Sequence, residues 1–178
     1  MSRETYLKQV YYSAFNEILD LKIPYGKRQY RLPTNPINTL ISFGNSLVYT
    51  VSLSRIYRTQ LNLTISFLHE PGERRFSLSL DLAEIFKPLI ADRLMFRLLG
   101  GNQIRESDHF DNELNGCYLT EEGRKIYIRE FDSVLKTTIK HPRLKRSVSY
   151  QRLIRLECYK SIKHLTEIET YQPLHPWW

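Results

Sequence analysis

The hydrophobic residues of the chain recur mainly at the three- and four-residue spacing that is typical of helices. This spacing predicts helices over residues 4–20, from Pro36 through Val51, over 77–99, over 121–136, and through Leu165 near the C-terminus. The helix around residues 77–99 is apolar on most sides, so we expect it to be central and mostly buried. There are no internal repeats. The pattern therefore predicts an all-α fold, a single compact multi-helix domain spanning residues 1–178.

Local signals define where these helices begin and end. Asn35 is a good N-cap with Pro36 at the first helical position, and Thr120 precedes two glutamates. Ser147 or Ser149 is expected to cap the last helix. Pro88 lacks an amide donor and should kink or interrupt the central helix, which Gly100-Gly101 ends. Residues 102–119 are polar and rich in turn residues, which leaves room for one or two short extended pieces.

An acid pair lies within the apolar central helix. Asp81 and Glu84 are three residues apart, so their side chains should point the same way. Removing two carboxylates from water costs roughly several kcal/mol each unless cations or hydrogen bonds compensate them. His69 lies just upstream, across a turn marked by Pro71 and Gly72. An imidazole and carboxylates together form a ligand set for manganese, magnesium or zinc.

The same residues have a simpler interpretation. His69 can be an ordinary loop histidine, and the acids can form a narrow solvent-facing stripe in which Glu84 pairs with Lys87. Glu4, on the apolar face of the first helix, can simply complement the helix dipole. Tyr49 in the second helix is typical of a core tyrosine whose hydroxyl is hydrogen-bonded. Spacing alone leaves both interpretations open.

Composition narrows the class of protein. The chain has 178 residues, of which 42% are hydrophobic and 25% charged, values typical of one globular domain. No apolar run approaches bilayer length, and the first residues contain no signal-peptide core, so we expect a cytoplasmic protein without a membrane segment. Cys117 and Cys158 form no metal-type cluster and are expected to be reduced and inert.

The net charge of +7 makes nucleic acid the first partner to consider. The excess is greatest between His141 and Leu165, where Glu157 is the only acid and the basic residues are Arg143, Lys145, Arg146, Arg152, Arg155, Lys160 and Lys163. A solvated basic helix face without a partner would have the same composition.

Several strings along the chain resemble a known family. They are NPINTLISFGNSLVYT, ISFLHEP, RRFSLSLDLAEIFKPLIADR and YLTEEGRKIYIREF. Over essentially its whole length, the chain closely resembles the C-terminal helical (catalytic) domain of the CRISPR-associated integrase that inserts new spacers into CRISPR arrays. Members of that family also carry an N-terminal β-rich domain, which this chain, beginning at Met1, is expected to lack.

The resemblance implies a site. It places the metal ligands at Glu4, His69 and Glu84, with Asp81 in or beside the first shell, and the ion as Mg²⁺ or Mn²⁺. The match at Glu4 is the loosest, because Thr5 stands where the family has glycine. Tyr49 resembles a family tyrosine close to the metal pocket. Four basic residues near the site are expected to bind DNA phosphates: Arg74, Arg75, Lys87 and Arg93.

The function implied by the resemblance is that of a divalent-metal-dependent DNA endonuclease and integrase of CRISPR adaptation, which joins spacer DNA ends to the repeat array by phosphoryl transesterification. The implied partners are double-stranded or branched DNA and the small partner protein of the spacer-acquisition complex. A homodimer would depend on the family's N-terminal domain. The alternative is a catalytically impaired, shortened remnant that acts as a DNA- or partner-binding module. A helix-turn-helix regulator is disfavoured, because no short recognition-helix signature is present.

Overall fold

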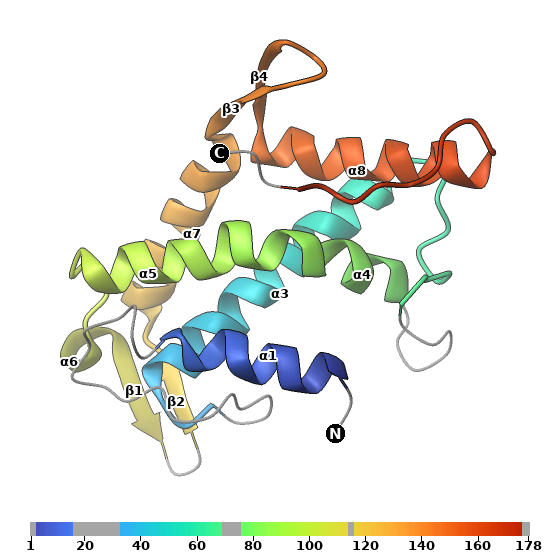
Figure 1. The fold of residues 1–178 in the computed structure, drawn as a ribbon. Coiled ribbons are helices and arrows are strands. Elements are labelled where there is room, and N and C mark those ends of the chain that lie inside the picture. The colour runs from blue at the N-terminus through green and yellow to red at the C-terminus, as the bar shows by residue number, and fades with distance from the viewer. Residues whose placement is uncertain (1–2, 16–32, 69–75, 114–115, 176–178) are drawn as a thin grey trace. The chain divides into compact units, whose positions relative to one another are not determined.

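The structure, a computed structural model of the 178-residue chain, describes residues 3–15, 33–68, 76–113 and 116–175 (Figure 1). Most of these residues are helical, which confirms the predicted fold class. The helices are α1 (Arg3–Ser13), α3 (Pro36–Ile56), α4 (Ser77–Phe86), the π-helix η1 (Lys87–Asp92), α5 (Arg93–Gly100), α6 (Glu106–His109), α7 (Glu121–Lys136) and α8 (Tyr150–Leu165). The strands form two antiparallel hairpins, β1 (Phe110–Glu113) with β2 (Gly116–Leu119) and β3 (Thr138–His141) with β4 (Arg146–Ser149).

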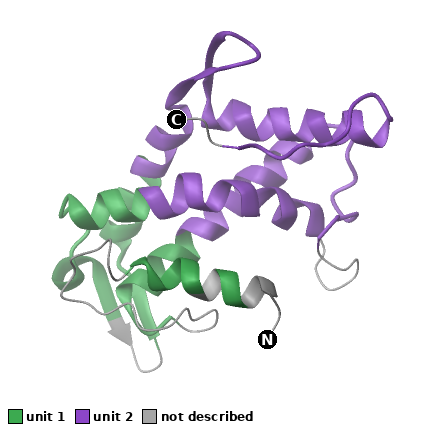
Figure 2. Cartoon of the chain, viewed as in Figure 1, with its two compact units in different colours: residues 1–43, 94–129 green, residues 44–93, 130–178 purple. Residues whose placement is uncertain are grey.

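The chain divides into two compact units (Figure 2). The first contains Met1–Phe43 and Leu94–Arg129, and the second contains Gly44–Arg93 and Glu130–Trp178. Helices α3, α5 and α7 each contribute residues to both units. The single domain over residues 1–178 remains a prediction, because contact-dense units within one chain can belong to one larger domain.

In the first unit, α1 packs differently from the sequence prediction. Leu7, Val10 and Tyr11 lie at the spacing of one apolar helix stripe, which predicts that they are buried, but all three side chains are exposed. Phe15, just beyond α1, is buried instead and its ring lies 4.7 Å from that of Phe96. The apolar spacing was helical, as predicted, but spacing does not show which residues of a helix find a partner. Residues 16–20 of the predicted helix lie outside the described residues.

Helix starts follow the predicted caps. In each case a side-chain oxygen accepts a hydrogen bond from the amide three residues further on, which satisfies a donor that the first helical turn leaves unpaired. The pairs are Asn35 with Asn38 (2.8 Å), Thr120 with Gly123 (3.1 Å) and Ser149 with Arg152 (3.2 Å). Of the two predicted caps for α8, Ser149 is therefore the one used.

The predicted central helix is present as α4, η1 and α5 in succession. Its buried residues include Leu82, Ala83, Phe86 and Ile90, which confirms that it is mostly buried. The interruption predicted at Pro88 takes the form of the six-residue π-helix, with proline in its first turn. Because proline has no amide hydrogen, the regular α-helical bond cannot form there, and the helix widens.

Both cysteines are buried and unpaired with each other. Burial raises the pKa of the Cys158 thiol to about 12, and burial also raises that of Cys117. Little reactive thiolate is therefore present at neutral pH, in agreement with the expected inertness. None of the described helices combines the length and the apolar character needed to cross a bilayer.

The assignment of Ser149 as the N-cap of α8 can be tested by substitution. Ser149→Ala should lower the free energy of unfolding by about 1 kcal/mol, because it removes the acceptor for the Arg152 amide. Ser147→Ala, on the same strand and exposed, is the matched control and should change it by less than about 0.5 kcal/mol. Urea unfolding followed by circular dichroism measures both. Equal effects of the two substitutions would contradict the assignment of the cap.

Candidate functional site

The segment that precedes His69 is fastened to the start of α4. The Leu78 amide donates to the Leu63 carbonyl at 3.1 Å, and the Ser77 hydroxyl donates to the Thr64 carbonyl at 3.0 Å. These bonds use groups of the first turn of α4, which have no partner within their own helix. Residues 63–64 and the start of α4 therefore form one hydrogen-bonded unit.

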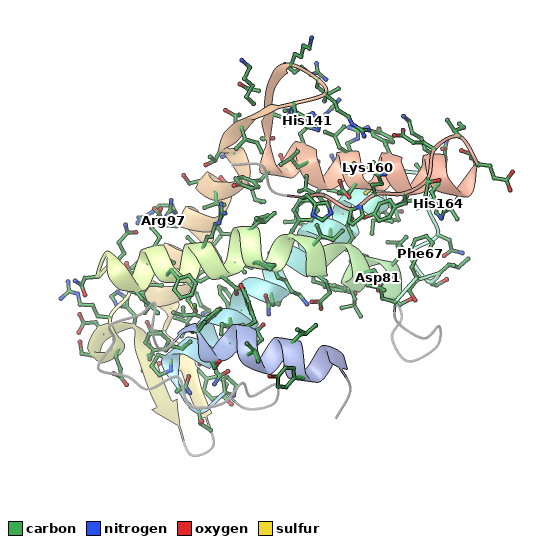
Figure 3. All side chains as sticks on the ribbon, in the orientation of Figure 1. Phe67, Asp81, Arg97, His141, Lys160 and His164 are labelled. Carbon is green, nitrogen blue, oxygen red and sulfur yellow. The ribbon has the colours of Figure 1, made fainter. Side chains whose placement is uncertain are left out.

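Asp81 completes this fastening. Its Oδ2 atom accepts hydrogen bonds from the amides of Phe67 at 2.6 Å and Leu68 at 3.0 Å. Figure 3 shows Phe67 and Asp81 next to one another at the α4 end of the second unit. Asp81 is only 7% exposed, so the solvent-facing stripe considered from the sequence is wrong for this residue. Two amide donors satisfy the buried carboxylate and fix the backbone immediately before His69.

Glu84 lies one turn further along α4 and is only partly buried. Its Oε1 atom is 2.6 Å from Lys87 Nζ, and the two side chains are 34% and 18% exposed respectively. The Glu84–Lys87 pair of the simpler sequence interpretation is therefore present. The two acids thus differ in environment, because Asp81 accepts hydrogen bonds from backbone amides, whereas Glu84 is paired with the ammonium group of Lys87.

Both acids line an open, largely apolar pocket of about 700 Å³ within the second unit. Phe67 and Leu68 form part of its wall, α4 forms another part, and the end of α8 with the residues that follow it forms the rest. His164 in the last turn of α8 is the only histidine among the described residues that line this pocket. The pocket therefore offers a concave surface at which two carboxylates and one imidazole are present.

Tyr49 lies in a second pocket, of about 330 Å³, whose lining also includes Lys87. Asn45 and Ser46, from the same helix, and Leu80 complete this lining. Lys87 therefore contacts Glu84 and also borders the tyrosine pocket. The sequence interpretation placed Tyr49 and Lys87 near the site on the family resemblance alone, and the structure brings these two residues to one pocket.

Most of the remaining predicted site residues lie, wholly or in their side chains, outside the described part of the structure. Glu4 belongs to α1 in the first unit, and its side chain is outside the described part of the structure. His69, Arg74 and Arg75 also lie outside the described residues. Arg93 is the exposed first residue of α5. The ligand set and the DNA-binding arginines therefore remain predictions.

The described residues can be compared with the needs of a divalent metal. Within residues 3–15, 33–68, 76–113 and 116–175, no three His, Cys, Asp or Glu side chains form a metal-binding group. Glu84 is a suitable oxygen ligand for Mg²⁺ or Mn²⁺, although its charge is already balanced by Lys87. Asp81 Oδ2 is occupied by two amides. Glu84 thus fits a ligand role, and Asp81 fits a role in positioning the segment that leads to His69.

The C-terminal segment contributes residues that the sequence reasoning did not connect with the site. Thr170, Tyr171 and Pro173 line the larger pocket. The Tyr171 hydroxyl donates to Glu157 Oε2 at 3.0 Å, and burial, followed by the nearby Glu157 charge, raises the pKa of Tyr171. The apolar end of the sequence, TYQPLHPWW, predicts a tail that docks on the domain or on a partner, and the Tyr171 bond shows that this part docks on α8. Trp177 and Trp178 lie outside the described residues.

Comparisons with known proteins agree with the family resemblance. A family model described as CRISPR associated protein Cas1 matches residues 1–133. The chain is 56% identical to "CRISPR-associated endonuclease Cas1 3" of Thermodesulfovibrio yellowstonii, with all of this chain and 54% of that protein aligned. It is 52% identical to "CRISPR-associated endonuclease Cas1 2" of Moorella thermoacetica, again over all of this chain and 54% of the relative. The chain thus spans about half the length of these curated relatives.

Solved structures show the same likeness. A CAS1 protein from Thermotoga maritima is 42% identical and superposes with a TM-score of 0.86, covering 94% of this chain and 52% of that chain. A casposase bound to its integration product is 23% identical, with a TM-score of 0.85 over 96% of this chain and 48% of that chain. At that identity the casposase shows a shared fold and nothing further.

The Asp81 contacts can be tested directly. Asp81→Ala should lower the free energy of unfolding by about 3–6 kcal/mol, because two hydrogen bonds to a charged group are worth about 1.5–3 kcal/mol each. Hydrogen exchange at the Phe67 and Leu68 amides should accelerate by roughly tenfold or more. Asp81→Asn keeps an oxygen acceptor without the charge and should have an intermediate effect on both measurements.

Asp132→Ala is the matched control, since Asp132 forms an exposed pair with Lys136 on α7. It should change the free energy of unfolding by less than about 1 kcal/mol and leave the exchange of the Phe67 and Leu68 amides unaltered. If Asp81→Ala left those two amides as protected as in the wild type, the anchoring role of Asp81 would be wrong.

Proposed function

The chain belongs to the CRISPR-associated Cas1 family, and on that premise we propose that it provides the helical catalytic part of a divalent-metal-dependent DNA endonuclease and integrase of CRISPR adaptation. The reaction is phosphoryl transesterification that joins spacer DNA ends to the repeat array, or in the reverse sense resolves branched DNA. The observation that carries the proposal is the match to the Cas1 family over residues 1–133, together with endonuclease relatives that align over the whole chain.

The proposed metal ligands are Glu4, His69 and Glu84. One imidazole nitrogen and two carboxylates suit Mn²⁺ or Mg²⁺, with the remaining positions available to water and phosphate oxygens. When bound, the ion would polarise the scissile phosphate and lower the pKa of the attacking DNA hydroxyl. Glu84 supports this proposal because it is partly exposed, faces an open pocket and lies one helical turn from Asp81.

Asp81 acts in this proposal as a positioning residue. Its carboxylate holds the amides of Phe67 and Leu68, the two residues directly before His69. Because the amides of residues 67 and 68 are held, the chain that leads to His69 would lose less conformational freedom when the imidazole binds a metal ion. Catalysis of phosphoryl transfer depends mainly on such positioning and on charge stabilisation.

Lys87 has a second role in the proposal. In the structure it neutralises Glu84 at 2.6 Å. If Glu84 held a metal ion, its carboxylate would no longer need the Lys87 ammonium group, and Lys87 would be free to bind a DNA phosphate. Tyr49 borders the same pocket and can donate its hydroxyl proton to a phosphate oxygen. Arg74, Arg75 and Arg93 are proposed as further phosphate-binding residues.

The proposed partners are double-stranded or branched DNA and the small partner protein of the spacer-acquisition complex. A homodimer is proposed for the protein when it includes the N-terminal β-rich domain of the family. The second candidate function is a DNA- or partner-binding module with impaired catalysis. The Glu84–Lys87 pair favours this binding-module function, because an acid that is neutralised by a lysine is stable without any metal.

Cleavage of DNA separates the two functions. Incubation of the chain with a splayed or branched duplex and Mn²⁺ should give cleavage or strand joining that a chelator abolishes. His69→Ala and Glu84→Gln should each lower the rate at least roughly 100-fold, because each removes a metal ligand, while DNA affinity changes little. Denaturing gels and a parallel binding titration measure the two quantities.

His175→Ala and Glu121→Gln are the matched controls, since both residues are exposed and lie outside the proposed site. They should retain the wild-type rate. Binding without any metal-dependent cleavage would favour the binding module, and cleavage that survives both His69→Ala and Glu84→Gln would refute the proposed ligand set.

A further inference from the structure

The positive charge of the chain is concentrated in one stretch. The chain has 26 Lys and Arg residues and 19 Asp and Glu residues. Residues 133–156 contain seven of the basic residues and none of the acids, so outside this stretch 19 cations balance 19 acids. The whole net charge of +7 therefore lies in 24 residues: the end of α7, the β3–β4 hairpin and the first half of α8.

The hairpin presents most of this charge to solvent. In β3–β4 the register pairs His141 with Arg146, and a four-residue turn connects them. Figure 1 shows the hairpin extending away from α8 with its turn at the far end. Residues 142–147 are all exposed. Lys145 has a left-handed backbone with φ of 50°, a conformation that costs a non-glycine residue about 1–2 kcal/mol and that glycine or asparagine would adopt more readily.

Only part of this charge is neutralised within the chain. Arg143 pairs with Glu169 at 3.1 Å, and Lys136 pairs with Asp132. By contrast, Lys145, Arg146 and Arg152 form no ion pair with any described residue. Lys145 and Arg146 are consecutive at the end of the turn, and Arg152 follows in the first turn of α8. All three cations are exposed and have no counterion among the described residues, and together they are called the basic surface.

We propose that this surface, which consists of Lys145, Arg146 and Arg152, binds the phosphate backbone of DNA. The proposal rests on the proposed DNA-processing function and adds to it a contact made by residues other than the acid pair and its neighbours. When lysine and arginine side chains neutralise DNA phosphates, the counterions condensed on the DNA are released. This release contributes affinity that does not depend on the base sequence. The contact therefore positions DNA on the protein and should be independent of sequence.

DNA is favoured over a lipid surface by the composition of the hairpin. Membrane-surface segments combine cations with a continuous apolar face. Here Leu144 is the one large apolar side chain that is exposed among residues 138–149, at 40%, while Val148 is buried. A two-stranded ribbon with adjacent cations instead suits the regular spacing of phosphates.

Salt dependence of DNA binding tests the proposal. For a duplex without metal, the double variant Lys145→Ala/Arg146→Ala should reduce the slope of log affinity against log salt by about 2, since each lost phosphate contact removes about 0.9. Arg152→Ala should reduce it by about 1 further. Lys145→Arg/Arg146→Lys keeps both charges and should retain the wild-type slope.

The chain offers a matched control. Arg124 and Lys125 on α7 are also consecutive, exposed and basic, and Arg124→Ala/Lys125→Ala changes the net charge by the same amount. This double variant should lower the slope by less than about 0.5, because it changes only the long-range electrostatic field of the protein and removes no phosphate contact. Unchanged circular dichroism and unfolding midpoints show that each variant folds.

Three outcomes would overturn the proposal. If both double variants reduced the slope equally, net charge rather than the hairpin would account for binding. If the hairpin variant bound DNA like the wild type while the wild type cleaved DNA, the proposed function would stand and this contact would be wrong. If the hairpin variant kept its DNA affinity but no longer bound phosphatidylserine vesicles, the surface would belong to a lipid.

Discussion

The structure around the candidate site depends on one buried carboxylate. Asp81 is almost inaccessible to water, and an unpaired charge in that position would cost several kcal/mol, by order of magnitude. The amides of Phe67 and Leu68 compensate this charge by donating hydrogen bonds to it. Burial of Asp81 in α4 therefore requires that residues 67 and 68 present their amides to its carboxylate. Two further bonds, from Ser77 and Leu78, hold the start of the same segment. Folding of α4 and placement of residues 67 and 68 are therefore one event.

Helical spacing then gives neighbouring residues different tasks. Asp81, Glu84 and Lys87 follow one another at intervals of three residues, which aligns them along one side of the helix. The first is committed to backbone amides, the second is partly exposed in a pocket, and the third neutralises the second while it borders the pocket of Tyr49. A carboxylate bound by backbone amides, a partly exposed carboxylate and the cation that neutralises it thus lie on consecutive turns. Pro88 follows immediately and converts the helix to a π-helix.

Sequence reasoning succeeded where the determining interactions are local. The caps at Asn35 and Thr120 depend on amides three residues away, and the break at Pro88 depends on the amide hydrogen that proline itself lacks. This local origin explains their agreement with the structure. It failed where the partner is distant. Asp81 accepts hydrogen bonds from amides 13 and 14 residues upstream, and no periodicity reveals such donors. Spacing alone therefore left open whether cations or hydrogen bonds compensate this carboxylate. The β3–β4 hairpin was not predicted either, because its polar, proline-containing turn resembles an ordinary loop. The pocket that unites Tyr49 with Lys87 is a tertiary feature as well.

The central claim is that Asp81, without binding the metal itself, positions His69 so that it can share an ion with Glu84. The most direct test is the Mn²⁺ affinity of the Asp81→Ala variant, measured by electron paramagnetic resonance of free Mn²⁺ in the absence of DNA. The account predicts affinity about 10–100-fold weaker than that of the wild type, the effect expected when a residue supporting a ligand is lost. Equal Mn²⁺ affinity in the wild type and in Asp81→Ala, with affinity lost in Glu84→Gln, would contradict it.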